Sequence, residues 1–237
     1  MIRKLKALGL AVCAIAAMTA VMAPAAQAET GALTAAEYPA IITGEQQPGI
    51  TFDIGAGPAR TVECTTSDLS STILAPTDPV TLKPRYENCR SEPGFRPATV
   101  TTNACDYSLG VSKPGTTEQP ATTGRMQMRL VCPPGQQLEI HVYENAARHV
   151  ENVSTCTYDV GAQAAVPGGI YHNTPAGDVL ATVNAPFNGL NTMGPVFLCG
   201  GMAGQNIPVT LTGNYTLRGF IETEEGIEGA QTPIHVG

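Results

Sequence analysis

The chain has no tryptophan, and only 5% of its 237 residues are aromatic. A core with so few large side chains gains less from burial, so cross-links between strands become important for stability. Glycan-binding proteins commonly present exposed aromatic rings. We expect Tyr107 and Tyr158 to be buried, which leaves Tyr143 and Tyr171 as the two candidates for such a platform.

Positive charge is also scarce, with 13 Lys and Arg against 20 Asp and Glu. Arg3, Lys4 and Lys6 belong to an N-terminal targeting segment, so the remaining chain carries ten basic against twenty acidic residues, a net charge of −10. A chain this acidic repels phosphate backbones and anionic lipid. The composition therefore argues against nucleic acid and membrane surfaces as partners.

The first 28 residues read as a secretory signal peptide. The basic start is followed by an apolar run over residues 8–21 and by Ala26-Gln27-Ala28, a small-x-small cleavage pattern. Lipidation at Cys13 is disfavoured because bulky Val12 precedes it. No second apolar run of membrane length follows. We expect a secreted or cell-envelope protein with no membrane span in residues 29–237.

The motifs of common enzyme classes are missing. There is no Gly-x-Ser-x-Gly nucleophile turn, and the spacing of His141 and His149 does not fit a metalloprotease helix. On a strand, His141 would point to solvent. A run of acidic residues near the C-terminus lies in a Gly-containing tail that would not hold two carboxylates at a fixed distance: Glu222, Glu224, Glu225 and Glu228. The sequence therefore predicts no catalytic residue, no metal site and no cofactor.

Six cysteines remain beyond the signal peptide: Cys64, Cys89, Cys105, Cys132, Cys156 and Cys199. An even set in an exported chain indicates three disulfides. Zinc binding is disfavoured because the shortest spacing, Cys89 to Cys105, is 16 positions. Six cysteines allow many pairings, and we favour the sequential one, Cys64–Cys89, Cys105–Cys132 and Cys156–Cys199.

The middle pair has independent support from strand register. If Cys105 lies opposite Cys132, then Tyr107 faces Leu130 and Leu109 faces Met128, so every apolar residue falls on one side. The Pro- and Thr-rich residues 113–124 then form a long hairpin loop. The Cys-x-Tyr pattern recurs at Cys156, which predicts a duplicated β element with both tyrosines turned inward.

Short segments of period-two alternation, separated by Gly and Pro turns, recur along the chain. They predict an all-β fold, an antiparallel β-sandwich or barrel-like domain stapled by three disulfides. Pro84 cannot donate to a ladder, so its strand should lie at an edge. We expect one domain over residues 29–237, with residues 29–48 and 222–237 poorly ordered.

Four segments carry a resemblance: Leu-Lys-Pro-Arg-Tyr-Glu-Asn-Cys at 82–89, Ala-Cys-Asp-Tyr-Ser-Leu at 104–109, Val-Cys-Pro-Pro-Gly at 131–135 and Thr-Cys-Thr-Tyr at 155–158. Together with the signal peptide, they resemble secreted cysteine-framework proteins of soil actinobacteria. The resemblance covers about residues 60 to 220. It implies a bacterial, extracytoplasmic location and a shape, and it implies no activity.

These observations predict a non-enzymatic envelope or extracellular β-protein with a binding or structural role, whose ligand is a protein or a polysaccharide. The alternative is an extracellular hydrolase that acts on a polymer, with a site assembled from loops. A cleft that places His141 or His172 beside a carboxylate would favour the hydrolase. Four histidines scattered over the surface would exclude it.

Overall fold

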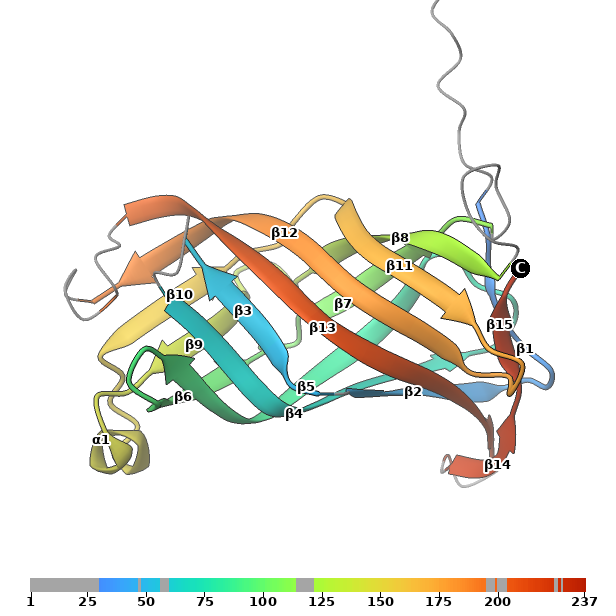
Figure 1. The fold of residues 1–237 in the computed structure, drawn as a ribbon, viewed down its shortest axis with the longest axis horizontal. Helices are drawn as coiled ribbons and strands as arrows, with labels where there is room; N and C mark the ends of the chain where they lie inside the picture. Colours follow the sequence, from blue (N-terminus) through green and yellow to red (C-terminus); the bar gives the residue numbers. More distant parts are fainter. Residues whose placement is uncertain are drawn as a thin grey trace, which may run out of the picture.

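Segments in which buried and exposed residues alternate make up most of the described chain. These segments form strands (Figure 1). The computed structural model describes residues 30–46, 48–55, 60–113, 122–194, 199, 204–223, 226 and 228–237. Its elements are β1 (Leu33–Ala35), β2 (Ala40–Gln46), β3 (Ile50–Ile54), β4 (Arg60–Ile73), β5 (Val80–Glu92), β6 (Arg96–Thr101), β7 (Asp106–Val111), β8 (Thr123–Val131), β9 (Leu138–Val142), α1 (Ala146–Val150), β10 (Cys156–Val160), β11 (Val166–Asn173), β12 (Val179–Met193), β13 (Gly204–Glu222), β14 (Glu228–Thr232) and β15 (Ile234–Val236).

Four long strands form the frame of the molecule. β4 pairs with β5 from Thr61 to Ser70, and β12 pairs with β13 from Val179 to Thr192. β2 and β3 follow one another along the space between β13 and β4, and each pairs with both of these strands. The result is a continuous curved sheet that runs the length of the molecule (Figure 1).

Two sets of short strands connect β5 back to β12. β7, β8 and β11 make the connection at one end, and with β2 and the four long strands they complete an eight-stranded antiparallel barrel, the first ring. β6, β9 and β10 make the same connection at the other end with β3, and we call this closure the second ring. The prediction of an all-β, barrel-like fold is confirmed.

The predicted hairpin is present with the predicted register. In β7 and β8, Tyr107 lies opposite Leu130 and Leu109 lies opposite Met128. All three predicted disulfides also form, Cys64–Cys89, Cys105–Cys132 and Cys156–Cys199. Tyr107 and Tyr158, from the two Cys-x-Tyr copies, are 1% and 0% exposed and lie in the first and second ring respectively.

Pro84 lies where the two sets of short strands separate. β5 pairs with β7 at Val80–Leu82 and with β6 at Cys89–Ser91. Between these stretches, and within the described residues, no strand pairs with that side of β5. β5 is therefore not an edge strand as a whole, but Pro84 occupies a local edge where a missing N–H donor does no harm.

The interior is mostly apolar, and where the two rings meet it holds hydrogen-bonded tyrosines. The Tyr86 and Tyr107 hydroxyls are 2.7 Å apart, and the Tyr215 hydroxyl is 2.7 Å from Ser67 Oγ. Burial raises the pKa of Tyr86, Tyr107 and Tyr215 above the ordinary tyrosine value, because a phenolate there would lack water. Paired hydroxyls avoid the penalty of unsatisfied buried groups.

The segments over residues 29–48 and 222–237, for which the sequence suggested poor order, contain strands. β1 and β2 lie within residues 29–48, and β14 and β15 lie within 222–237. Leu33 of β1 pairs with Val236 of β15, so the chain ends secure each other. The predicted signal peptide, with Cys13, lies outside the described residues. Among the residues that are described, no helix is long and apolar enough to cross a membrane.

Candidate functional site

A groove runs across the outer faces of β7 and β8. In both strands, buried residues alternate with residues that face outward. The outward residues along the groove are Ser108 and Gly110 on β7 and Arg125, Gln127 and Arg129 on β8. The inward set, which includes Leu109 and Met128, fills the first ring. The hairpin thus contributes to the core with one face and to the groove with the other.

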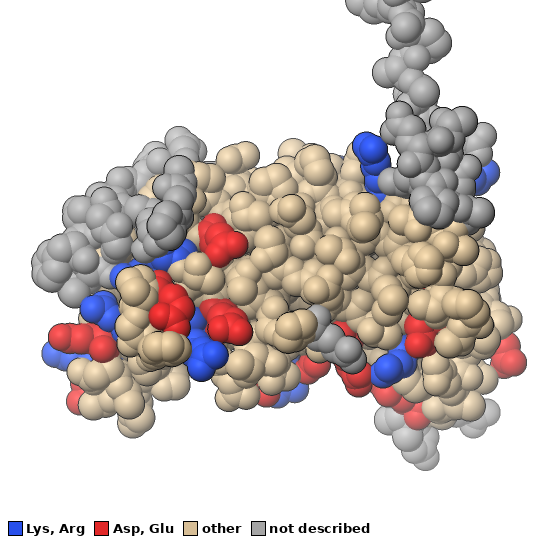
Figure 2. Space-filling model, in the orientation of Figure 1, with Lys and Arg blue, Asp and Glu red and all other residues tan. Residues whose placement is uncertain are grey.

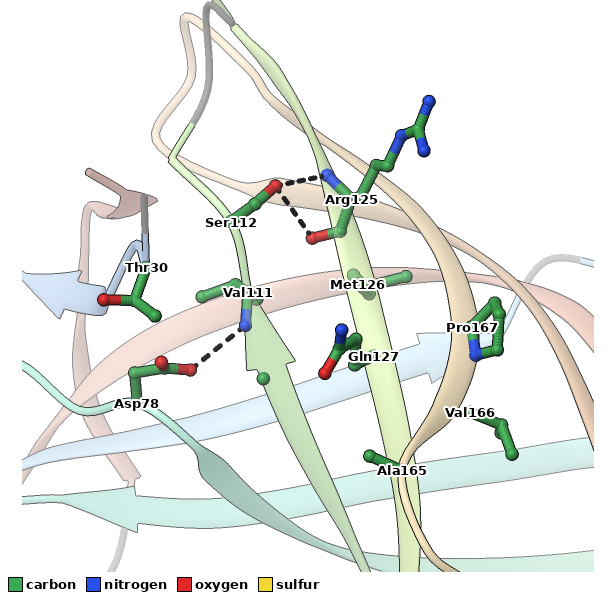
Figure 3. Close-up of a pocket in the computed structure, with 11 residues that line it drawn as sticks. Thr30, Asp78, Val111, Ser112, Arg125, Met126, Gln127, Ala165, Val166 and Pro167 are labelled. Atoms are coloured by element: carbon green, nitrogen blue, oxygen red, sulfur yellow. Dashed lines mark hydrogen bonds between the residues drawn. The ribbon is translucent and has the colours of Figure 1, made fainter. Parts of the chain in front are cut away.

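The larger part of the groove has a volume of about 410 Å³. Its walls come from distant parts of the chain: Thr30 and Asp78 stand on one side, and residues 165–167 stand on the other (Figure 3). A second hollow of about 190 Å³ adjoins it, with Asp78, Gly110, Gln127 and Ala165 in common. The second hollow adds Pro79, Ser108 and Arg129 to the lining.

Hydrogen bonds hold the groove walls in place. Asp78 Oδ1 accepts from the Val111 backbone N–H at 3.0 Å, and Ser112 Oγ accepts from the Arg125 backbone N–H at 2.9 Å (Figure 3). The Gly31 N–H donates to the Val111 carbonyl at 2.9 Å, and Thr30 pairs with Ser112. The predicted start of the exported chain is therefore part of the groove wall.

Gly110 keeps the floor of the groove open. A Cβ placed on Gly110 would lie 3.7 Å from Asp78 Oδ1 and 4.0 Å from Gln127 Cβ, which are ordinary contact distances. Larger side chains at this position would project between these two walls without a backbone clash. A larger side chain at position 110 could therefore fill the groove without disturbing the β7 backbone.

The groove offers both apolar and polar contacts. Val166, Pro167 and Ala165 supply an apolar wall, and Asp78, Gln127 and Arg129 supply a carboxylate, an amide and a guanidinium. The Gln127 side chain extends toward Asp78 in Figure 3. An apolar cleft with a few convergent polar groups is typical of a ligand site. These residues were not singled out from the sequence, although Arg125, Gln127 and Arg129 alternate with the buried residues of β8.

A second polar constellation lies on the outer face of β9 and β10, in the second ring. His141 Nε2 lies 3.0 Å from Glu139 Oε2, and His141 Nδ1 lies 3.2 Å from Thr157 Oγ1. Ser154 Oγ lies 3.4 Å from the same Nδ1 and 3.1 Å from Thr157 Oγ1. The side chains of His141 and Glu139 are 25% and 31% exposed, so the cluster is open to solvent.

Asp159 adds a buried carboxylate beside this cluster. It lies directly opposite Glu139 in the ladder between β9 and β10 and is 5% exposed. Burial raises the pKa of Asp159, and the neighbouring Glu139 charge acts in the same direction, while His141 and a hydrogen bond with Gln137 oppose both. Its Oδ1 has no hydrogen-bond partner among the described residues.

The other histidines lie apart from this cluster and have local roles. The His149 ring packs edge-on against Tyr143 at 4.9 Å, His172 contacts Thr123, and His235 contacts Thr34. Within the described ranges, no group of three or more His, Cys, Asp and Glu residues could hold a metal ion. Of the acidic run in the tail, Glu222 pairs with Glu228 between β13 and β14, and Glu224 and Glu225 lie outside the described residues.

The predicted aromatic platforms are wrong, because Tyr143 and Tyr171 are 2% and 1% exposed. Tyr143 lies beneath α1 and donates its hydroxyl to Asn152 Oδ1 at 3.2 Å. The register between β11 and β8 shifts at Pro167–Gly169, after which Tyr171 lies opposite Gly124 and its hydroxyl donates to the Ser112 carbonyl. The shift changes which side of β11 faces inward.

Charged side chains are unevenly distributed over the face drawn in Figure 2. They gather toward the end that holds α1 and along the lower edge, while the area over β11, β12 and β13 is largely free of them. Several outward residues on β12 and β13 are neutral and polar, among them Thr182, Asn214 and Thr216. Thr182 Oγ1 donates to Asn214 Oδ1 at 2.9 Å. The part of this sheet face that Figure 2 draws thus presents little charge.

No protein-family model matches the chain, and neither a curated protein nor a solved structure is similar to it at the level of the comparison. Three disulfides in a β-barrel are typical of proteins that fold in an oxidising, extracytoplasmic compartment.

Proposed function

We propose that this chain is an exported bacterial binding protein that holds part of a protein ligand in the groove over β7 and β8. The observation that carries the proposal is the groove itself, with its volume of about 410 Å³ and its mixed lining. That volume is in the range of ligand sites in proteins. The binding role and the bacterial, secreted location continue the expectation from the signal peptide and the cysteine framework.

The lining favours a peptide segment over a polysaccharide. Among the described residues that line either hollow, none is aromatic, whereas sugar sites commonly use aromatic rings as stacking surfaces. Pro167 and Val166 offer an apolar surface for small aliphatic side chains. Gln127 and Arg129 are two positions apart on β8. Their side chains offer hydrogen-bond donors for a carboxylate or a backbone carbonyl. We expect a segment that combines small apolar and acidic residues.

The position of Thr30 connects this site to export. The predicted cleavage after Ala28 leaves Thr30 as the second residue of the exported chain, and Thr30 lines the groove. An uncleaved signal peptide would continue directly from this wall. We therefore expect ligand binding to require the processed chain.

The test is an array of seven-residue peptides, probed with the processed chain and with a Gly110→Val variant. The valine side chain would occupy the floor between Asp78 and Gln127. We expect peptides rich in Asp, Glu, Ala and Val to be retained by the parent chain and to lose at least tenfold in affinity for the variant. Gly161→Val is the matched control, because a Cβ at Gly161 meets nothing within 4 Å and Gly161 does not line the groove.

Equal retention of the same peptides by Gly110→Val would contradict the site. Binding to a glycan array but to no peptide would contradict the ligand class and would revive the polysaccharide alternative. Circular dichroism of both valine variants provides the check that neither substitution has disturbed the barrel.

A further inference from the structure

We propose that Ser154, His141 and Glu139 form a nucleophilic centre that accepts acyl groups from carboxylic esters. This centre is separate from the groove, since the groove lies on the first ring and these residues lie on the second ring. It goes beyond the binding role and does not depend on it. The observation that carries it is a continuous hydrogen-bonded path from a carboxylate through an imidazole to a hydroxyl.

Glu139 sets the tautomer of His141. A carboxylate accepts hydrogen bonds and does not donate them, so the proton on the imidazole resides on Nε2, 3.0 Å from Glu139 Oε2. Nδ1 then carries the lone pair and faces the hydroxyls of Thr157 and Ser154 at 3.2 and 3.4 Å. This is the order of carboxylate, base and hydroxyl that activates a serine nucleophile, with the two ring nitrogens exchanged relative to the familiar serine proteases.

Ser154 is better placed to react than Thr157. Thr157 belongs to β10, and its backbone is held between β9 and β12 in the register with His141 and Met193. Ser154 precedes β10 in a segment outside the strands and has a primary hydroxyl that is less hindered. Thr157 Oγ1 lies 3.1 Å from Ser154 Oγ, so Thr157 is a positioning residue that holds the nucleophile beside the base.

The reaction proceeds in two steps. Ser154 Oγ bonds to the ester carbonyl carbon while its proton moves to His141 Nδ1, and collapse of the tetrahedral adduct breaks the carbon–oxygen bond to the alcohol. The departing oxygen takes the proton from Nδ1, which leaves an acyl-serine and the free alcohol. A water molecule then loses a proton to Nδ1 and attacks the acyl carbon, which releases the carboxylic acid and returns the proton to Ser154.

The exposure of the cluster points to esters that are accessible at a surface. The side chains of His141 and Glu139 are 25% and 31% exposed on the outer face of the second ring. Small acyl groups attached to large molecules could reach such a position without entering an enclosed cavity. We therefore expect short-chain esters, such as acetyl esters, to react in preference to long-chain esters.

The first test is covalent labelling of the processed chain with a fluorophosphonate, which bonds to an activated serine oxygen with loss of fluoride. We expect mass spectrometry of the peptides to place the adduct on Ser154. The label should fall at least tenfold in His141→Gln and should remain in Ser70→Ala, a control serine that is exposed on β4 and is not among the residues that line the groove. An adduct at another residue, or labelling that is unchanged in His141→Gln, would overturn the proposal.

The second test is hydrolysis of p-nitrophenyl acetate. General-base catalysis typically accelerates a reaction about 10²–10⁴-fold, so Ser154→Ala and His141→Gln should each lose about 100-fold or more in kcat/KM. Glu139→Gln should retain more activity than Glu139→Ala, because the carboxamide oxygen still accepts from Nε2. A Ser154→Ala variant as active as the parent would show that the imidazole acts without the serine, and the proposed nucleophile would be wrong.

Discussion

The two rings share β4, β5, β12 and β13, and they differ in the four strands that complete each closure. The short strands of the first ring build a groove on their outer face. Those of the second ring present a hydrogen-bonded cluster around His141. The shared strands therefore determine the shape of the molecule, and the strands that are not shared carry the two surfaces with distinct chemistry.

The interiors of the rings also differ. Apolar side chains such as Leu82, Met128 and Leu130 fill the first ring, whereas Arg60, at 5% exposure, is buried in the second. Arg60 donates to Ser91 Oγ at 3.3 Å. Burial lowers the pKa of Arg60, and the nearby Arg96 charge acts in the same direction while Tyr158 opposes it. Among the described residues, the second ring thus encloses a charge, Arg60, for which the first ring has no buried counterpart.

Removal of the disulfides is the largest change that would distinguish the rings. Cys156–Cys199 of the second ring spans 43 residues, and Cys105–Cys132 of the hairpin spans 27. The chain-entropy account predicts losses of about 4 and about 3.5 kcal/mol in the free energy of unfolding for the respective double alanine variants. Urea denaturation under non-reducing conditions measures both. If the free energy of unfolding falls by less than about 1 kcal/mol for either double variant, the backbone hydrogen bonds between the strands are sufficient to hold that ring closed.

Core truncations test whether the rings unfold together. Leu130→Ala in the first ring and Ile140→Ala in the second remove side chains that are 1% and 0% exposed, and each should lower stability by about 2–5 kcal/mol. Since four strands run through both rings, we expect both variants to shift one common transition. Unfolding followed by far-ultraviolet circular dichroism and by tyrosine fluorescence should give the same transition midpoint. Two separated transitions in either variant would mean that the rings are independent units.

The hairpin was predictable because its information is local. Cys105 and Cys132 fix its ends, and a slip of one residue would turn Tyr107 or Met128 to solvent. Ring closure was not predictable in the same way, because β5 changes partner from β7 to β6 along its length. Each of these two pairings can form without the other. Neither the spacing of the cysteines nor the alternation of buried and exposed residues indicates that one strand takes part in both.

The candidate sites show the same limit. His141 was correctly placed on the outer face of its strand, but its contact with Ser154 depends on how the segment after α1 returns to β10. The groove forms only because Thr30 and Asp78 meet the β7–β8 hairpin. These contacts join residues that are far apart in the sequence. Tyr171 was assigned to the surface because the register shift at Pro167–Gly169 leaves little trace in the residue pattern.

The smallest predicted effect concerns Asp159, the buried carboxylate beside the second-ring cluster. Its raised pKa means that the folded chain binds the proton more tightly than the unfolded chain. This carboxyl therefore stabilises the fold at low pH, and that contribution is lost as the pH rises through the raised pKa. Asp159→Asn removes the charge and should increase the free energy of unfolding at pH 7 by on the order of 1 kcal/mol.

The gain from Asp159→Asn should shrink as the pH falls toward about 4, because the parent carboxyl, whose pKa in the folded chain is raised above its ordinary value, is then increasingly protonated. Asp106→Asn is the control on the first ring, where Asp106 faces outward beside Val131 and is only half-buried. We expect no comparable gain there. Urea denaturation of the parent chain and both variants at pH 7 and pH 4 measures the difference. A gain of equal size at both pH values would show that the asparagine stabilises by packing, and the contrast between the rings would then rest on shape and not on charge.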